Sequence, residues 1–209
     1  HTQFGLPFPP LGERFDRLEE GINIIKTLWG EGPASYEGKF YNVKDVDMLP
    51  KPVYGADTPI LIGGKGPKRT IPLIAKYADE WNAVNVRVEE YRHLVGVLAD
   101  RCADLDRDPA TVQQSIMAFP LVAGDERSLD RMTRWHMSMS GATGSPAAYR
   151  EDKRANSNMI IGLTNEVIDL IGQFAELGAV EMQFEHFNFG SDEWPDYLAS
   201  EIAPQVAGF

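Results

Sequence analysis

The segment most able to support chemistry is residues 60–82, ILIGGKGPKRTIPLIAKYADEWN. An apolar strand leads into a glycine-rich turn, GGKGP at 63–67, and the turn opens directly into a helix. Glycines let backbone N–H groups approach an anion closely, and the helix dipole favours negative charge at that point. Lys65, Lys68 and Arg69 add positive charge within the same five residues. The pattern predicts a phosphate site. The alternative interpretation is a tight strand-to-helix turn followed by a solvated basic helix start.

Two common nucleotide-binding motifs do not fit this turn. A dinucleotide-binding turn of the Gly-x-Gly-x-x-Gly type that starts at Gly64 and Gly66 needs a third glycine at position 69, which is Arg69. A Walker-type loop needs Gly-Lys-Ser/Thr at a fixed spacing, and the sequence lacks it. Any phosphate bound here would therefore belong to another class of coenzyme or ligand.

The four histidines are His1, His93, His136 and His186, and none has a partner at metal-ligand spacing. We therefore expect no metal site. His93 and His136 fall within amphipathic helices, which is typical of half-buried packing residues. His186 lies beside Glu185 at the carboxyl end of a predicted strand, the end that faces the active site in a parallel α/β fold. This position makes His186 a candidate site residue.

Polar residues alternate along that last strand. Glu181, Gln183 and Glu185 share one face, which indicates either a lined cavity or a solvated edge strand. Signatures of a nucleophilic serine are absent, because Ser115 and Ser128 have no Gly-x-Ser-x-Gly context. The sequence alone therefore assigns no catalytic residue.

The elements expected around these residues alternate between strands and helices, which is typical of a parallel α/β sheet. The predicted strands are 59–63, 80–86, 114–122 and 180–187, with a short β-like step at 159–162. The predicted helices are 13–30, the segment up to about 78, 88–107, the region around 129–139, 164–177 and 197–206. A small hairpin is expected at 36–41, and 141–158, rich in Gly, Ser, Ala and Asn, is predicted to be a mobile loop.

Composition limits the partners. Among 209 residues, 20 are Lys or Arg and 31 are Asp or Glu, which gives a net charge of −11 and argues against nucleic-acid or membrane-surface binding. No apolar run is long enough to span a membrane, and no signal peptide is visible. The single cysteine, Cys102, cannot form an internal disulfide, which favours the cytoplasm. The acidic balance does not exclude a small-molecule partner, such as a small anion at a local basic site.

Several segments together resemble the luciferase-like monooxygenase family, particularly its coenzyme F420-dependent oxidoreductase branch. The matching segments are HTQFGLPFPPLGERFDRLEEGINIIKTLW at 1–29, YEGKFYNVKDVDMLPKPV at 36–53, PILIGGKGPKRTIPLIAKYADEWN at 59–82, IIGLTNEVIDLIGQFAELGAVEMQF at 160–184 and YLASEIAPQV at 197–206. The fourth departs from the family's Gly-x-Pro step by having Leu-Thr-Asn after its glycine.

The resemblance implies a (β/α)8 barrel with insertions, a fold that needs about 250 residues. We expect residues 1–209 to form one luciferase-like domain, truncated at its N-terminus relative to the family and containing the C-terminal half of the barrel. The chain begins at His1 without an initiator Met. The strands to which the family's catalysis is assigned would precede it, so the catalytic residues stay unassigned. Open barrel edges favour association. We therefore expect either a homodimer or completion by an N-terminal half, and no turnover by this chain alone.

The same resemblance implies hydride transfer between coenzyme F420 and an unidentified organic substrate. FMN-dependent monooxygenation, a non-catalytic coenzyme-binding relative and an unrelated α/β phosphate-binding domain are the alternatives. The glycines Gly63 and Gly64 match those whose backbone contacts the coenzyme phosphate. The residues expected to contact the coenzyme are Gly63, Gly64, Lys65, Gly66, Pro67, Lys68, Arg69, Asn82 and Val84, and those expected near the substrate are Arg87 and His186.

Overall fold

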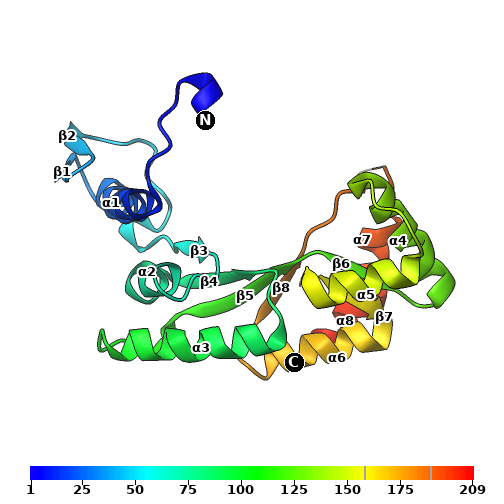
Figure 1. Cartoon of the computed structure of the whole chain (residues 1–209). Coiled ribbons are helices and arrows are strands. Elements are labelled where there is room, and N and C mark those ends of the chain that lie inside the picture. The colour runs from blue at the N-terminus through cyan, green and yellow to red at the C-terminus, as the bar shows by residue number, and fades with distance from the viewer. Residues whose placement is uncertain (158, 189) are drawn as a thin grey trace. The chain divides into compact units, whose positions relative to one another are not determined.

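The structure, a computed structural model, describes residues 1–157, 159–188 and 190–209 (Figure 1). It divides into two compact units, residues 1–60 and 61–209. Each unit is described by itself, and the expectation of one domain stays a prediction.

The first unit is a long helix with a β-hairpin. The helix α1 (Leu11–Trp29) follows Pro10 and ends at Gly30. The carboxylate of Glu20 on α1 accepts hydrogen bonds from the backbone N–H groups of Lys39 (2.9 Å), Phe40 (3.0 Å) and Tyr41 (3.2 Å), and so ties the hairpin turn to the helix. The predicted hairpin is confirmed, with a turn slightly longer than expected. The other elements of this unit are η1 (Thr2–Phe4), β1 (Ala34–Glu37), β2 (Asn42–Val46) and η2 (Gly55–Asp57).

The second unit is built on a four-stranded parallel sheet in the order β3-β4-β5-β8. Its strands are β3 (Leu61–Gly63), β4 (Glu80–Val84), β5 (Gln113–Ala118) and β8 (Glu181–Phe184). All four main strands predicted from the sequence are present and parallel, although each is shorter than expected. The sheet does not close on itself within the described residues, so the observed architecture is a partial barrel with two edges, β3 and β8.

Helices cover one face of this sheet. The helices α2 (Thr70–Tyr77), α3 (Val88–Ala103) and α6 (Thr164–Ala175) pack in succession, α2 on α3 and α3 on α6. Figure 1 shows α3 and α6 along the same side of the strands. The fully buried Trp81 of β4 stacks on Tyr91 of α3 at 5.4 Å, and Tyr91 meets Phe174 of α6 edge-on at 5.6 Å. This aromatic core lies between the sheet and its helices, and it leaves alternate residues of each strand facing the other side.

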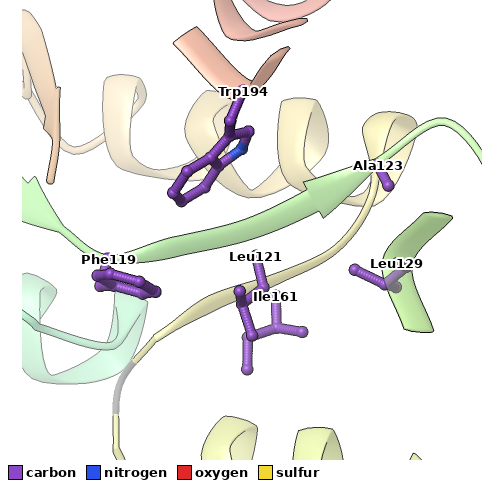
Figure 2. Packing of buried hydrophobic residues seen from close by; sticks show 6 residues of the cluster. All are labelled: Phe119, Leu121, Ala123, Leu129, Ile161 and Trp194. Atoms are coloured by element: carbon purple, nitrogen blue, oxygen red, sulfur yellow. The ribbon is translucent and has the colours of Figure 1, made fainter. Parts of the chain in front are cut away.

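A second, smaller parallel sheet extends from the first. The predicted strand 114–122 is interrupted at Phe119, and its continuation, β6 (Pro120–Ala123), pairs with β7 (Ile160–Leu163). Their buried side chains form a core cluster with α4 (Glu126–Ser140) and α7 (Glu193–Tyr197). The cluster, drawn in Figure 2, consists of Phe119, Leu121, Ala123, Leu129, Ile161 and Trp194.

The prediction of a mobile loop over 141–158 was wrong, because most of it is the helix α5 (Pro146–Asn156). Ser145 caps this helix by accepting a hydrogen bond from the N–H of Ala148 at 3.2 Å. Arg150 on α5 is only 7% exposed and pairs with Glu126 and Asp130 of α4. The polar composition of this segment does not indicate a helix, because one of its few buried residues is an arginine paired with exposed carboxylates of α4. Asn158, within the same prediction, lies outside the described residues.

Other boundaries also shift. The helix predicted over 88–107 ends at Ala103, and the closing helix predicted over 197–206 begins at Glu193 as α7. It continues through a π-helical turn, η4 (Leu198–Ile202), into α8 (Ala203–Val206). One short helix, η3 (Pro109–Thr111), precedes β5.

Two helix ends have the same hydrogen-bond pattern with different residues at the left-handed position. After α6, the N–H groups of Gly178 and Ala179 donate to Ala175 and Phe174 at 2.9 and 3.1 Å, with Gly178 at φ +100°. After α3, Asp106 takes the equivalent position at φ +52°. The predicted glycine stop of α6 is confirmed, while α3 tolerates an aspartate because its φ lies in the region that Asp can occupy.

We expect Gly178→Ala to lower the free energy of unfolding by about 1–2 kcal/mol, because a Cβ is strained at φ +100°. That Cβ would also lie 3.3 Å from Nε2 of Gln114. The matched change Asp106→Gly should alter stability by less than about 0.5 kcal/mol, since relief of left-handed strain offsets the greater entropy of the unfolded chain. Urea denaturation of both variants checks this. Equal losses would show that the two ends do not differ in strain.

Candidate functional site

The glycine-rich turn is anchored to the neighbouring strand. Gly63 pairs in register with Asn82, and the N–H of Gly64 donates to the carbonyl of Asn82 at 2.9 Å. The carbonyl of Gly64 accepts a hydrogen bond of 2.7 Å from Nε1 of Trp81. Gly64 has φ +125°, a conformation that side chains rarely allow. The strand β4 therefore fixes the path of the turn through both polar groups of one glycine.

The next glycine brings the turn against the start of α2. A Cβ on Gly66 would lie 2.8 Å from Oγ1 of Thr70, and a Cβ on Gly64 would lie 3.1 Å from its Cγ2. The N–H of Ile71 donates to the carbonyl of Gly66 at 3.0 Å. This cradle exists only without side chains at 64 and 66. Because the N–H groups of Gly64 and Ile71 are bonded within the fold, the cradle offers a phosphate the N–H of Gly66 and the positive end of the helix.

The three cations of the turn have different surroundings. Lys65 points to the next loop, where its Nζ donates to the carbonyl of Asn85 at 3.0 Å and pairs with Glu90 at 3.2 Å. It thus bridges the β3–α2 turn to the β4–α3 turn. Lys68 and Arg69 are exposed, and no ion pair is recorded for Lys68 within the described part of the chain. Lys68 is therefore the cation of this turn most available to an anion.

Next to the turn, the sheet face opposite the helices carries a chain of hydrogen bonds. The hydroxyl of Ser115 donates to Glu80 at 2.5 Å and accepts from Nδ2 of Asn82 at 2.9 Å. The same amide nitrogen reaches Oε1 of Gln183 at 3.3 Å, and Gln183 donates to Glu181 at 2.7 Å. Because a serine hydroxyl has one hydrogen, this network fixes which way the Asn82 amide points. Asn82 is 4% exposed and Ser115 fully buried.

This network bears on the two interpretations of the last strand. Gln183 faces inward onto Asn82, whereas Glu181 and Glu185 are exposed. Strand β8 is an edge of the described sheet. The strand thus combines both expectations, with one polar residue built into the sheet face and the others in solvent.

Arg87 lies at the start of α3, just beyond β4. Its Nη1 donates to the carbonyl of Ala155 on α5 at 3.2 Å. It lines a cavity of about 280 Å³ together with Arg154 and Met159. Val84, the last residue of β4, is half-buried and pairs with Met117. Arg87 therefore lines one cavity with Arg154, which sequence reasoning did not single out, and with the acidic Glu89.

His186 lies elsewhere. It lines a different cavity, of about 420 Å³, with Met182 and Phe184, and it meets the indole of Trp194 edge-on at 5.7 Å. None of the predicted coenzyme residues is among the described residues that line this cavity. The structure therefore does not bring His186 together with Arg87, and its substrate role stays a prediction.

The helical histidines differ from each other. The Nδ1 of His136 lies 2.7 Å from the hydroxyl of Tyr149, and burial, with a smaller contribution from Lys153, lowers the pKa of this imidazole. His136 is thus a packing residue, as predicted, whereas the same prediction was wrong for His93, which is exposed. Among the described residues no group of three or more His, Cys, Asp or Glu is placed to hold a metal ion. No helix in the described part of the chain is long and apolar enough to cross a membrane.

Four residues of the site were missed or undervalued in the sequence. Thr70 fills the cradle made by two glycines, and Trp81 holds the turn from the neighbouring strand. Ser115 was considered only as a nucleophile, while Arg154 was placed in a loop. The Gly-x-Gly spacing followed by a threonine at the helix start was the available signal for Thr70. The roles of Trp81, Ser115 and Arg154 depend on contacts with residues far away in the sequence, which local sequence does not indicate.

Comparison with known proteins shows which family has this sequence and fold. A family model described as "Luciferase-like monooxygenase" matches residues 1–181. The chain belongs to the luciferase-like monooxygenase family. The resemblance found in the sequence is confirmed, and the parallel sheet with helices on one face is the corresponding part of that family's barrel.

Three similar proteins illustrate the range of this family. The chain is 26% identical over 219 residues to an F420-dependent glucose-6-phosphate dehydrogenase of Beutenbergia cavernae, covering 97% of this chain and 64% of the relative. A solved F420-dependent secondary alcohol dehydrogenase in complex with an F420-acetone adduct matches with a TM-score of 0.71 and 18% identity, over 96% of this chain and 64% of that one. An EDTA monooxygenase from Chelativorans sp. BNC1 matches with a TM-score of 0.75 and 13% identity, over 99% and 62%. The chain thus spans less than two thirds of each.

Proposed function

We propose that this chain is the coenzyme-binding part of an oxidoreductase that transfers a hydride between coenzyme F420 and a small organic substrate. The observation that carries the proposal is the cradle of Gly64 and Gly66 around the start of α2, held by Trp81 and Asn82. The F420-dependent dehydrogenase among its relatives supports the choice of coenzyme. When bound, F420 supplies a two-electron hydride carrier that does not readily activate oxygen.

The chain's own residues divide the binding task. The N–H groups of the turn, with the dipole of α2, would hold the coenzyme phosphate. Lys68 and Arg69 would balance its charge, while Lys65 would hold the Asn85 loop in place. The fixed amide of Asn82 would border the coenzyme ring on the sheet face. Gly63 leaves that face open, since a Cβ there would meet only the Asn82 carbonyl, at 3.9 Å.

On the substrate side, Arg87 and Arg154 would bind a polar or anionic group in the cavity of about 280 Å³. We assign no proton donor or acceptor to the described residues. A homodimer that buries the open edges β3 and β8 and a cytoplasmic location are further parts of the proposal. They rest on the exposed strand edges and on the single buried cysteine.

FMN is the second candidate coenzyme. The similarity of fold to the EDTA monooxygenase favours it, because a monooxygenase uses oxygen, which F420 does not readily activate. FMN also carries a phosphate, so the same turn would serve. With FMN the reaction would be a monooxygenation. A non-catalytic relative would bind the coenzyme without turnover even as the intact gene product.

Titration of the purified chain with F420, FMN and NADP⁺, followed by absorbance or fluorescence, tests the proposal. We expect saturable binding of F420, at least about tenfold tighter than FMN, and no binding of NADP⁺. Tighter binding of FMN would move the chain to the monooxygenase side. Failure of both F420 and FMN to bind would contradict the proposal and leave the turn as a structural feature.

Substitution of the two lysines separates direct from indirect roles. We expect Lys68→Met to weaken coenzyme binding about three- to tenfold and to reduce its salt dependence, because an exposed cation near the phosphate is lost. Lys65→Met should lower the free energy of unfolding by about 0.5–1 kcal/mol, because a partly exposed bridge between two turns is lost. Titration at two salt concentrations and urea denaturation check both. If Lys65→Met weakened coenzyme binding and Lys68→Met did not, Lys65 would be the phosphate ligand.

A further inference from the structure

A cavity of about 360 Å³ lies between the carboxyl end of β6, α4 and α7, and neither the coenzyme turn nor Arg87 lines it. Two residues of the core cluster of Figure 2, Ala123 and Trp194, line it, and Trp194 reaches from α7 toward β6. A volume of this size is typical of a small-molecule site. Its elements come from two stretches of chain far apart in sequence, so the cavity depends on the tertiary fold.

The walls are aromatic and rigidly placed. Met132, Trp135 and Tyr197 are half-buried against the core cluster and border the cavity with their remaining surface. The hydroxyl of Tyr197 is hydrogen-bonded to Oγ1 of Thr164, which fixes its ring. Trp194 is 5% exposed and packs on Phe119 at 5.9 Å between ring centroids. Flat aromatic surfaces held in this way favour a flat ligand.

The mouth of the cavity is polar, but its groups are already paired. Arg131 forms an ion pair with Glu193, and both exposed residues line the cavity. The carboxylate of Asp125 accepts hydrogen bonds from the N–H and the hydroxyl of Ser128, at 3.0 and 2.9 Å. One guanidinium against two carboxylates gives the mouth a net negative charge. A ligand with its own negative charge is therefore disfavoured.

We propose that this cavity binds an uncharged aromatic molecule of about two rings, at a site independent of the coenzyme turn. The aromatic walls supply stacking and apolar burial, and the acidic mouth selects against carboxylates and phosphates. The phosphate-bearing coenzyme is thereby excluded from this site. The proposal stands whether or not the glycine turn binds F420.

Two naphthalene probes of the same shape test the charge selection. Naphthalene-2-carboxamide is neutral, whereas 2-naphthoate carries a negative charge at pH 7. In a protein labelled with ¹³C-methyl methionine, we expect the carboxamide to shift the Met132 methyl signal saturably. The signal of Met139, on the same helix but 51% exposed and away from the cavity, should stay in place. The naphthoate should bind at least about tenfold more weakly. A shift of neither methyl, or equal affinity for both probes, would overturn the proposal.

Variants measured by isothermal titration locate the site. Met132→Trp should fill the cavity and abolish binding of the carboxamide, while the matched Met139→Trp should leave it unchanged. Glu193→Gln removes one exposed carboxylate without touching the core, and should raise naphthoate affinity on the order of tenfold with little effect on the carboxamide. This variant decides the matter even if Met132→Trp does not fold. The proposal would be overturned if the naphthoate affinity were the same in Glu193→Gln as in the unmodified protein. It would also be overturned if the carboxamide displaced F420 or FMN.

Discussion

Gly64→Asp is expected to weaken coenzyme binding at least about 100-fold, since it removes the feature on which the proposed phosphate site depends. The new Cβ would be strained at φ +125°, and at 3.1 Å from Cγ2 of Thr70 it would force that side chain to shift slightly. The added carboxylate would also repel a phosphate held beside it at the start of α2. Titration with F420 and FMN measures the loss.

A matched control separates this effect from backbone strain. Gly144 has a similar φ of +107°, and a Cβ there would meet nothing within 4 Å. It precedes α5, outside the coenzyme turn. Gly144→Asp should therefore cost some stability and leave coenzyme affinity unchanged. Unchanged affinity in Gly64→Asp as well would mean that the turn is only structural.

Trp81→Ala is expected to lower the free energy of unfolding by about 3–5 kcal/mol, because Trp81 is fully buried and stacked on Tyr91. The more informative variant is Trp81→Phe, which keeps an aromatic ring in the core and removes the hydrogen bond to the Gly64 carbonyl. We expect it to cost about 1–2 kcal/mol and to weaken coenzyme binding several-fold.

Tyr91→Phe is the control for Trp81→Phe. It also removes one buried hydrogen bond, the 2.9 Å contact from Tyr91 to Gln114, and it touches the same aromatic core. Burial raises the pKa of the Tyr91 phenol, so this bond does not titrate near neutral pH. Denaturation should show a similar loss of stability with no loss of coenzyme affinity. If Trp81→Phe and Tyr91→Phe bind the coenzyme with the same affinity, the hydrogen bond to Gly64 does not position the turn.

Much of the second unit could be predicted from the sequence because its strands and helices are locally distinct. Continuous apolar strands such as residues 60–62 indicate a sheet covered by helices, and Gly178 marks a helix end through its backbone freedom. The glycine-rich turn could be found for the same reason. Its glycines are required by the backbone path, which local sequence encodes directly.

What the sequence did not predict depends on contacts between distant residues. The helix α5 is held by Arg150 against acidic residues of another helix, and its own composition is polar. The sequence predicts that Lys65 is a phosphate ligand, because its contacts with Asn85 and Glu90 are visible only in the structure. The interruption at Phe119 likewise follows from a change of pairing partner, from β8 to β7.

The most direct test of the central claim is the amide spectrum of the glycines. In a protein labelled with ¹⁵N-glycine, titration with F420 or FMN should shift the N–H signals of Gly64 and Gly66, which surround the start of α2. The signals of Gly141 and Gly144, in the α4–α5 connection, should stay in place. This result would place the coenzyme phosphate at the turn. Saturable coenzyme binding that leaves Gly64 and Gly66 unmoved would contradict the account.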